Sequence, residues 1–73
     1  MDQIRIGRFI AETRKQNNLT QRQLADKLQL LGLDVDKNAI QRMESGQRFV
    51  TDIELVHLAK VLNISYEQLL NID

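Results

Sequence analysis

Residues 19–28 read LTQRQLADKL and residues 36–46 read DKNAIQRMESG, and these two stretches indicate the class of structure most clearly. Each carries, at or next to its first position, a residue whose side-chain oxygen can cap a helix: Thr20 in the first stretch and Asp36 in the second. Such an oxygen accepts a hydrogen bond from the unpaired amides of the first helical turn. Gln23 follows Thr20 by three residues, which completes a capping box. The two stretches therefore predict two helices joined by a turn.

The rest of the chain carries similar helix signals. Further starts and ends are marked by Thr51 with Glu54, by Ser65 with Gln68, and by Asn17 and Asn18 after an opening helical segment. Gly32 and Gly46 lie where a helix commonly ends on a left-handed residue. The sequence has no proline, and its β-branched residues do not alternate with polar ones. We therefore predict an all-α protein of five helices.

Helical spacing predicts which side chains form the core. The expected buried residues are Ile6, Phe9, Ile10 and Thr13 in the first helix; Leu24, Ala25, Leu28 and Leu31 in the second; Ala39, Ile40 and Met43 in the third; and Leu55, Leu58, Ala59 and Leu62 in the fourth. Ile64, Leu69 and Leu70 are expected to close the core. Leu31, Leu33 and Val35 are expected to hold the turn against it.

Length and composition restrict the class of protein. A chain of 73 residues, 42% of them hydrophobic and 27% charged, is typical of one small folded domain, here residues 1–73. It contains no cysteine, which excludes disulfides and thiolate zinc sites. No apolar run approaches the roughly 20 residues that span a bilayer, and Arg5 and Arg8 interrupt the opening segment, unlike a signal peptide. We expect a cytoplasmic protein without a membrane partner.

The formal net charge is zero, but the charges are distributed unevenly. Residues 1–29 hold six basic and three acidic side chains, a net charge of +3. Residues 51–73 hold one basic and four acidic side chains, a net charge of −3. A polyanion could therefore meet one end of the chain without meeting the other. The alternative is that these charges only solvate a small surface.

The third predicted helix has two distinct faces. At about 100° per residue, Lys37, Asn38, Gln41 and Arg42 fall within an arc of roughly 140°, opposite its apolar residues. Each of the four can donate hydrogen bonds, and side chains of these kinds recognise base edges in the DNA major groove. Taken alone, the pattern also fits an ordinary amphipathic helix with a solvated side.

The segment before this helix, together with its end, favours the first interpretation. The quoted stretches, with residues 6–10, residues 13–15 and residues 58–70, resemble helix-turn-helix regulators of the Cro and phage-repressor type over nearly the whole chain. The resemblance implies a five-helix lambda-repressor-like domain whose reading unit covers about residues 20–45. It also implies sequence-specific binding to double-stranded DNA by a transcriptional regulator, which we expect to be a repressor and not an enzyme.

The resemblance further implies roles for particular residues. The base-reading positions would be Lys37, Asn38, Gln41 and Arg42, and the phosphate contacts would be Gln21, Gln47 and Arg48. Arg14 and Glu44 would form a structural pair that ties the first helix to the end of the third. Two alternatives stay open: Gln21 as a plain exposed residue of a first helical turn, and Arg14 as a free phosphate contact.

One departure from the family pattern is the turn at residues 29–36, which is longer by about five residues than the tight form. The tilt that this turn gives the third helix decides which of its donors reach bases.

The resemblance implies a homodimer on a palindromic operator, with half-sites about 34 Å apart. The dimer interface does not follow from the sequence, although Leu69, Leu70 and Ile72 are candidates. A second hypothesis is a protein-binding module, such as an antitoxin that binds DNA secondarily. Its docking surface would be the leucine-rich turn, with Leu30 and Leu33 exposed.

We expect no metal or other cofactor. The single histidine, His57, stands beside one carboxylate on its helix, whereas a metal ion needs several ligands. No glycine-rich phosphate loop is present, and no nucleophile has a base within recognisable reach.

Overall fold

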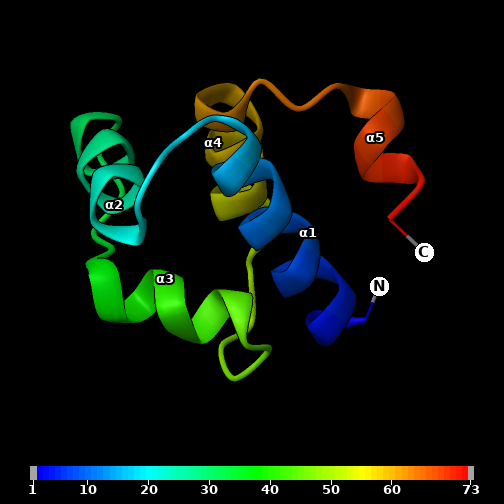
Figure 1. Ribbon diagram of the computed structural model, residues 1–73, viewed down its shortest axis with the longest axis horizontal. Helices are drawn as coiled ribbons and strands as arrows, with labels where there is room; N and C mark the ends of the chain where they lie inside the picture. The colour runs from blue at the N-terminus through cyan, green and yellow to red at the C-terminus, as the bar shows by residue number, and fades with distance from the viewer. Residues whose placement is uncertain (1, 73) are drawn as a thin grey trace.

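The protein folds into five α-helices. The computed structural model describes residues 2–72, and these residues contain no β-strand. In chain order the helices are α1 (Gln3–Gln16), α2 (Gln21–Leu30), α3 (Lys37–Glu44), α4 (Asp52–Leu62) and α5 (Tyr66–Leu70). In Figure 1, α1 and α4 lie at the centre of the molecule, α2 and α5 lie on either side, and α3 runs along the bottom. The predicted all-α, five-helix fold is confirmed.

Helices α2 to α5 begin at their predicted caps, whereas α1 begins after Asp2, which was not predicted as a cap. The Thr20, Thr51 and Ser65 capping boxes are all formed, with the side chains of Gln23, Glu54 and Gln68 completing them. Asp36 accepts a hydrogen bond from the backbone amide of Ala39 at 2.8 Å and so caps α3. These contacts are local in sequence, which is why the sequence alone predicts them.

Left-handed residues follow the helices. Gly32 has a φ of 92° and Gly46 a φ of 80°, as predicted for the ends of α2 and α3. Asn18 and Asn63 take the same conformation after α1 and α4, with φ values of 58° and 56°. Asparagine tolerates this region better than most residues because its short polar side chain bonds locally. Each of the four positions lets the chain turn sharply into the next segment.

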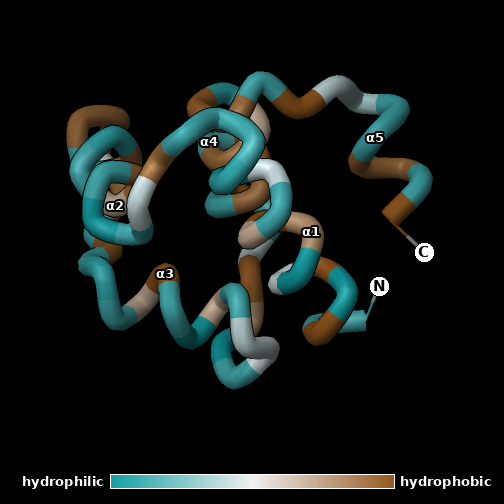
Figure 2. Tube along the Cα trace, viewed as in Figure 1, coloured by the Kyte–Doolittle hydropathy of each residue, from teal (hydrophilic) through white to brown (hydrophobic). Residues whose placement is uncertain are grey.

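The core lies where the first four helices meet, and it contains most of the predicted residues. Seven side chains are almost completely buried: Ile10, Leu24, Leu28, Ile40, Met43, Leu58 and Leu62. Phe9, Leu55, Ala59 and Leu69 are partly buried against this cluster. In Figure 2, α3 is mostly hydrophilic, and its hydrophobic positions face the rest of the molecule.

Two predictions of core residues are wrong. Leu31 is 45% exposed and Leu70 is 69% exposed. Leu31 lies just past the last residue of α2, so the helical period that predicts its burial no longer applies. Leu70 ends α5, a helix of five residues that buries none of its side chains completely.

The longer turn between α2 and α3 is ordered by its own contacts. The Leu33 amide donates to the Leu28 carbonyl at 3.1 Å, which closes the end of α2. The side-chain amide of Gln29 donates to the Val35 carbonyl at 2.8 Å. Val35 is buried and Leu33 is partly buried, as predicted, whereas Leu31 is not part of this anchor. The turn therefore delivers the chain to Asp36 in a fixed position at the start of α3.

Candidate nucleic-acid interface

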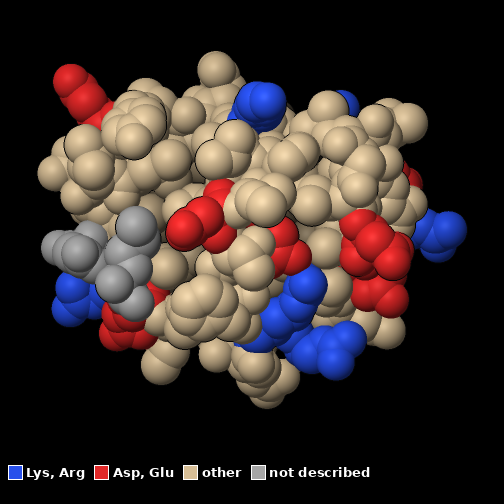
Figure 3. Space-filling view, turned by 180° about the vertical axis from the view of Figure 1, so that it is seen from behind, with Lys and Arg blue, Asp and Glu red and all other residues tan. Residues whose placement is uncertain are grey.

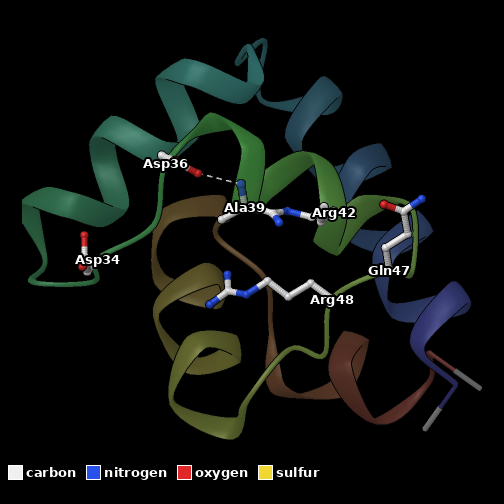
Figure 4. Close-up of a pocket in the computed structure, with 6 residues that line it drawn as sticks. All are labelled: Asp34, Asp36, Ala39, Arg42, Gln47 and Arg48. Carbon is white, nitrogen blue, oxygen red and sulfur yellow. Dashed lines mark hydrogen bonds between the residues drawn. The ribbon is translucent and has the colours of Figure 1, made fainter.

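The outer face of α3 carries the four predicted base-reading residues. Lys37, Asn38, Gln41 and Arg42 are all exposed. On the opposite face Ala39, Ile40 and Met43 are buried in the core. The Nε of Arg42 donates to the Asn38 carbonyl at 3.4 Å, so the arginine side chain lies along the helix toward its start (Figure 4). Its terminal guanidinium nitrogens make no hydrogen bond to the described residues. The four side chains thus stand together on one face of a helix that is anchored by the other.

Arg14 and Glu44 hold the end of α3 against α1. The Nε of Arg14 donates to Glu44 Oε2 at 2.7 Å, and its Nη2 donates to Glu44 Oε1 at 3.1 Å. The Nη1 of Arg14 donates to the Leu19 carbonyl at 2.8 Å. The side chains are only 11% and 8% exposed. Each of the three guanidinium nitrogens therefore donates a hydrogen bond inside the protein, and this geometry favours the structural role over a free phosphate contact.

Gln21 joins the same network. Its side-chain amide donates to Glu44 Oε1 at 3.0 Å, so Glu44 accepts bonds from both α1 and α2. A phosphate contact by this side chain would replace its bond to Glu44. The backbone amide of Gln21 lies in the first turn of α2, where the helix dipole favours an anion. The structure therefore gives the side chain a position inside the protein that the sequence did not predict.

Arg48 is also paired within the protein. Its Nη2 donates to Glu54 Oε2 at 2.9 Å, while Glu54 Oε1 accepts from the Thr51 amide in the capping box of α4. The Arg48 side chain is 35% exposed, and its Nη1 is buried without a hydrogen-bond partner among the described residues. A buried hydrogen-bond donor without a partner is unfavourable, so a ligand oxygen that accepted a hydrogen bond from Nη1 would be stabilised there.

Arg48 and Arg42 line one pocket beside the start of α3. Asp34, Asp36, Ala39 and Gln47 complete its lining, and Figure 4 shows the Arg48 guanidinium between α3 and α4. In the same view Gln47 points away from the other labelled side chains. Seen from behind, the lower half of the molecule shows basic groups close to acidic ones (Figure 3). The surface around α3 therefore combines cationic donors with carboxylates, which limits its attraction for an arbitrary polyanion.

Besides the bond from Gln21 to Glu44, two further features of the site were not predicted from the sequence. Gly7 lies in the middle of α1, where glycine is unfavourable, and its α-carbon faces the backbone of Met43 and Glu44 at the end of α3. An isolated glycine inside a helical pattern was the available signal for this close approach. The second feature is the partnership of Arg48 with Glu54, for which the sequence gives no local signal because it depends on how the loop folds back.

Neither a metal centre nor a membrane span is found between residues 2 and 72. These residues contain no cluster of three or more potential metal ligands. None of their helices is both long enough and apolar enough to cross a membrane.

The comparisons with known proteins agree with this geometry. A family model described as helix-turn-helix matches residues 10–69, which include α2, α3 and the loop that follows. No curated protein and no solved structure gives a significant match. The matched family binds DNA and is not a family of enzymes. The chain therefore belongs to the helix-turn-helix family, as a DNA-binding regulator of the Cro and phage-repressor type.

Proposed function

We propose that this protein is a sequence-specific DNA-binding repressor that reads the major groove with α3. One observation carries the proposal: four exposed hydrogen-bonding side chains share a face of α3, and the opposite face is buried in the core. The major groove of B-DNA is wide enough to take one helix. Arginine recognises guanine, and asparagine recognises adenine, each through a pair of hydrogen bonds. A helix fixed on its inner side can hold such side chains in register with base edges.

The neighbouring elements supply the contacts that position the helix. The start of α2, at Gln21, offers backbone amides to one phosphate, and the loop at Gln47 and Arg48 offers a cation and an amide to another. Phosphate contacts fix the orientation of the protein on the duplex but carry no sequence information. Discrimination between sequences then rests on Lys37, Asn38, Gln41 and Arg42.

We propose that two copies bind a palindromic operator. One short helix contacts too few base pairs to distinguish a site within a genome. The Cα atoms of one copy span 27 × 23 × 22 Å. Two copies side by side can therefore place their α3 helices about 34 Å apart, one turn of the duplex. A bound dimer would exclude other proteins from the operator in the cytoplasm, which is why we favour repression over activation.

Arg42→Ala is expected to weaken binding to the preferred operator by about 1 to 3 kcal/mol and to remove the preference at one base pair. Arg42 is exposed, so the variant should unfold at the same temperature as the wild type. Electrophoretic mobility shifts on operators altered one base pair at a time measure both effects. An equal loss on every duplex would mean that Arg42 contacts the phosphate backbone and not a base.

Arg48→Ala is expected to act in two ways. It should weaken binding to all duplexes alike. It should also make the plot of the logarithm of the association constant against the logarithm of the salt concentration less steep by about one, because one phosphate contact is lost. It should also lower stability without DNA by about 1 kcal/mol, because Glu54 loses its partner at a site that is partly screened by water. Titrations at several salt concentrations and a thermal melt separate these effects. Arg48→Lys serves as the control, since it keeps the charge and should keep the slope.

A second candidate function is a protein-binding module that uses the turn after α2. Leu30 is 87% exposed, as that hypothesis expects. Leu33 is partly buried against the core, so it does not form part of an open docking surface. Any such surface must therefore be built around Leu30 and its exposed neighbours.

A further inference from the structure

The end of the molecule opposite α3 carries an apolar groove, which we name the leucine groove. It is lined by Lys27, Leu30, Leu31, Lys60 and Val61. In Figure 1 the C-terminal ends of α2 and α4, which supply these residues, lie at the top of the molecule, and α3 lies at the bottom. In Figure 2 the chain at this end of α2 is coloured as hydrophobic. The groove is therefore separate from the proposed DNA-reading face.

The fold itself does not explain the leucines of this groove. Leu30 is the most exposed of the large hydrophobic residues that the structure describes. Neither Leu30 nor Leu31 belongs to the core cluster or to the partly buried side chains packed against it. Single exposed hydrophobic residues are common, but adjacent ones that line a groove are typical of binding surfaces. Leu30, at 87% exposed, contributes little to the packing of α2.

The charges around the groove select the kind of partner. Lys27 lies one helical turn before Leu30 on α2, Leu31 directly follows that helix, and Lys60 adjoins Val61 on α4. No acidic residue lines the groove. In Figure 3 the upper edge of the molecule is mostly uncharged, and the charged groups near its middle are basic. An apolar floor between two cations is complementary to an apolar stripe flanked by carboxylates.

We propose that the leucine groove binds an amphipathic helix of another protein, in which acidic residues flank a stripe of leucine-like side chains. An amphipathic helix presents such a stripe at positions i, i+3, i+4 and i+7. This inference rests on the second proposed function and names the chemistry of its partner. Because the groove lies at the far end from α3, the partner and a DNA duplex bind at the same time.

The proposal is tested with a fluorescein-labelled helical peptide of about 15 residues, with leucines in the stripe and glutamates on both sides. Fluorescence anisotropy measures the dissociation constant of this peptide for the 73-residue chain. Leu30→Ser is expected to weaken binding about tenfold, and Lys27→Glu with Lys60→Glu at least as much. Leu70→Ser is the matched control, since Leu70 is also an exposed leucine, at 69%, but lies on another helix, and it should change nothing. Thermal melts should show all of these variants folded.

Charge reversal gives the sharpest outcome. A peptide with lysines in place of the glutamates should bind the Lys27→Glu, Lys60→Glu variant in preference to the wild type. The proposal is overturned if the acidic and basic peptides bind the wild type equally, if neither binds it, or if Leu70→Ser weakens binding as much as Leu30→Ser. Operator binding by Leu30→Ser is measured in parallel. If Leu30→Ser no longer bound the operator, the peptide-binding and DNA-binding surfaces would not be separate. If it still binds the operator, the DNA-binding proposal stands or falls independently of the peptide result.

Discussion

Gly7→Ala is expected to lower the free energy of unfolding by about 3 kcal/mol, the upper end of the usual effect of overpacking. A methyl group on Gly7 would lie 2.3 Å from the Met43 carbonyl oxygen and 2.6 Å from the Glu44 carbonyl oxygen. Both oxygens belong to the backbone of α3, so no side-chain rotation can relieve the contact. The helices must move apart, which loosens the packing between α1 and the end of α3.

Thermal and urea unfolding measure this effect. For a domain of this size 1 kcal/mol corresponds to about 4 to 8 °C, so the melting temperature should fall by at least about 12 °C. Arg8→Ala is the control, because Arg8 is the next residue of α1 and is exposed. It should melt close to the wild type. A Gly7→Ala variant that matched Arg8→Ala would contradict the close approach of α1 to α3.

Arg14→Ala is expected to cost about 3 kcal/mol of stability in the absence of DNA. The change leaves the Glu44 carboxylate buried with only the Gln21 amide as a side-chain partner, and it removes the bond to the Leu19 carbonyl. Loss of one partner of a buried ion pair is far more destabilising than loss of an exposed pair, because the remaining charge stays desolvated.

A double-mutant cycle separates the pair from its surroundings. Arg14→Ala, Glu44→Ala and the double variant are compared by urea unfolding, and the double variant should lose much less than the sum of the single variants. Strict additivity, with each single loss below about 1 kcal/mol, would mean that the pair is unimportant for stability. Arg14→Ala that left unfolding unchanged but weakened DNA binding would instead support the alternative role as a phosphate contact.

The helix boundaries could be predicted because they depend on neighbours in sequence. Thr20 and Asp36 cap their helices through residues three positions away, and Gly46 ends α3 through its own conformation. The buried face of α3 follows in the same way from the helical period. The prediction of buried residues fails at Leu31, where the helical period was extended past the end of α2. It also fails at Leu70, which lies in the short helix α5.

The candidate site could be predicted less completely. The common exposed face of Lys37 to Arg42 follows from the spacing alone. The bond from Gln21 to Glu44 joins residues on α2 and α3, so it depends on how the two helices pack. The pairing of Arg48 with Glu54 depends on the path of the loop after α3. Such contacts between separate elements are set by tertiary packing, and no local pattern reveals them.

We claim that the outer face of α3 reads base pairs, and this is tested by selection from a pool of random duplexes at physiological salt. The wild type is compared with a variant in which alanine replaces Lys37, Asn38, Gln41 and Arg42. These side chains are exposed and alanine favours helix, so the variant should fold. The wild type should enrich one motif in two half-sites about 34 Å apart, and the variant should enrich none. Enrichment of the same motif by both proteins, or of no motif by the wild type, would contradict the claim.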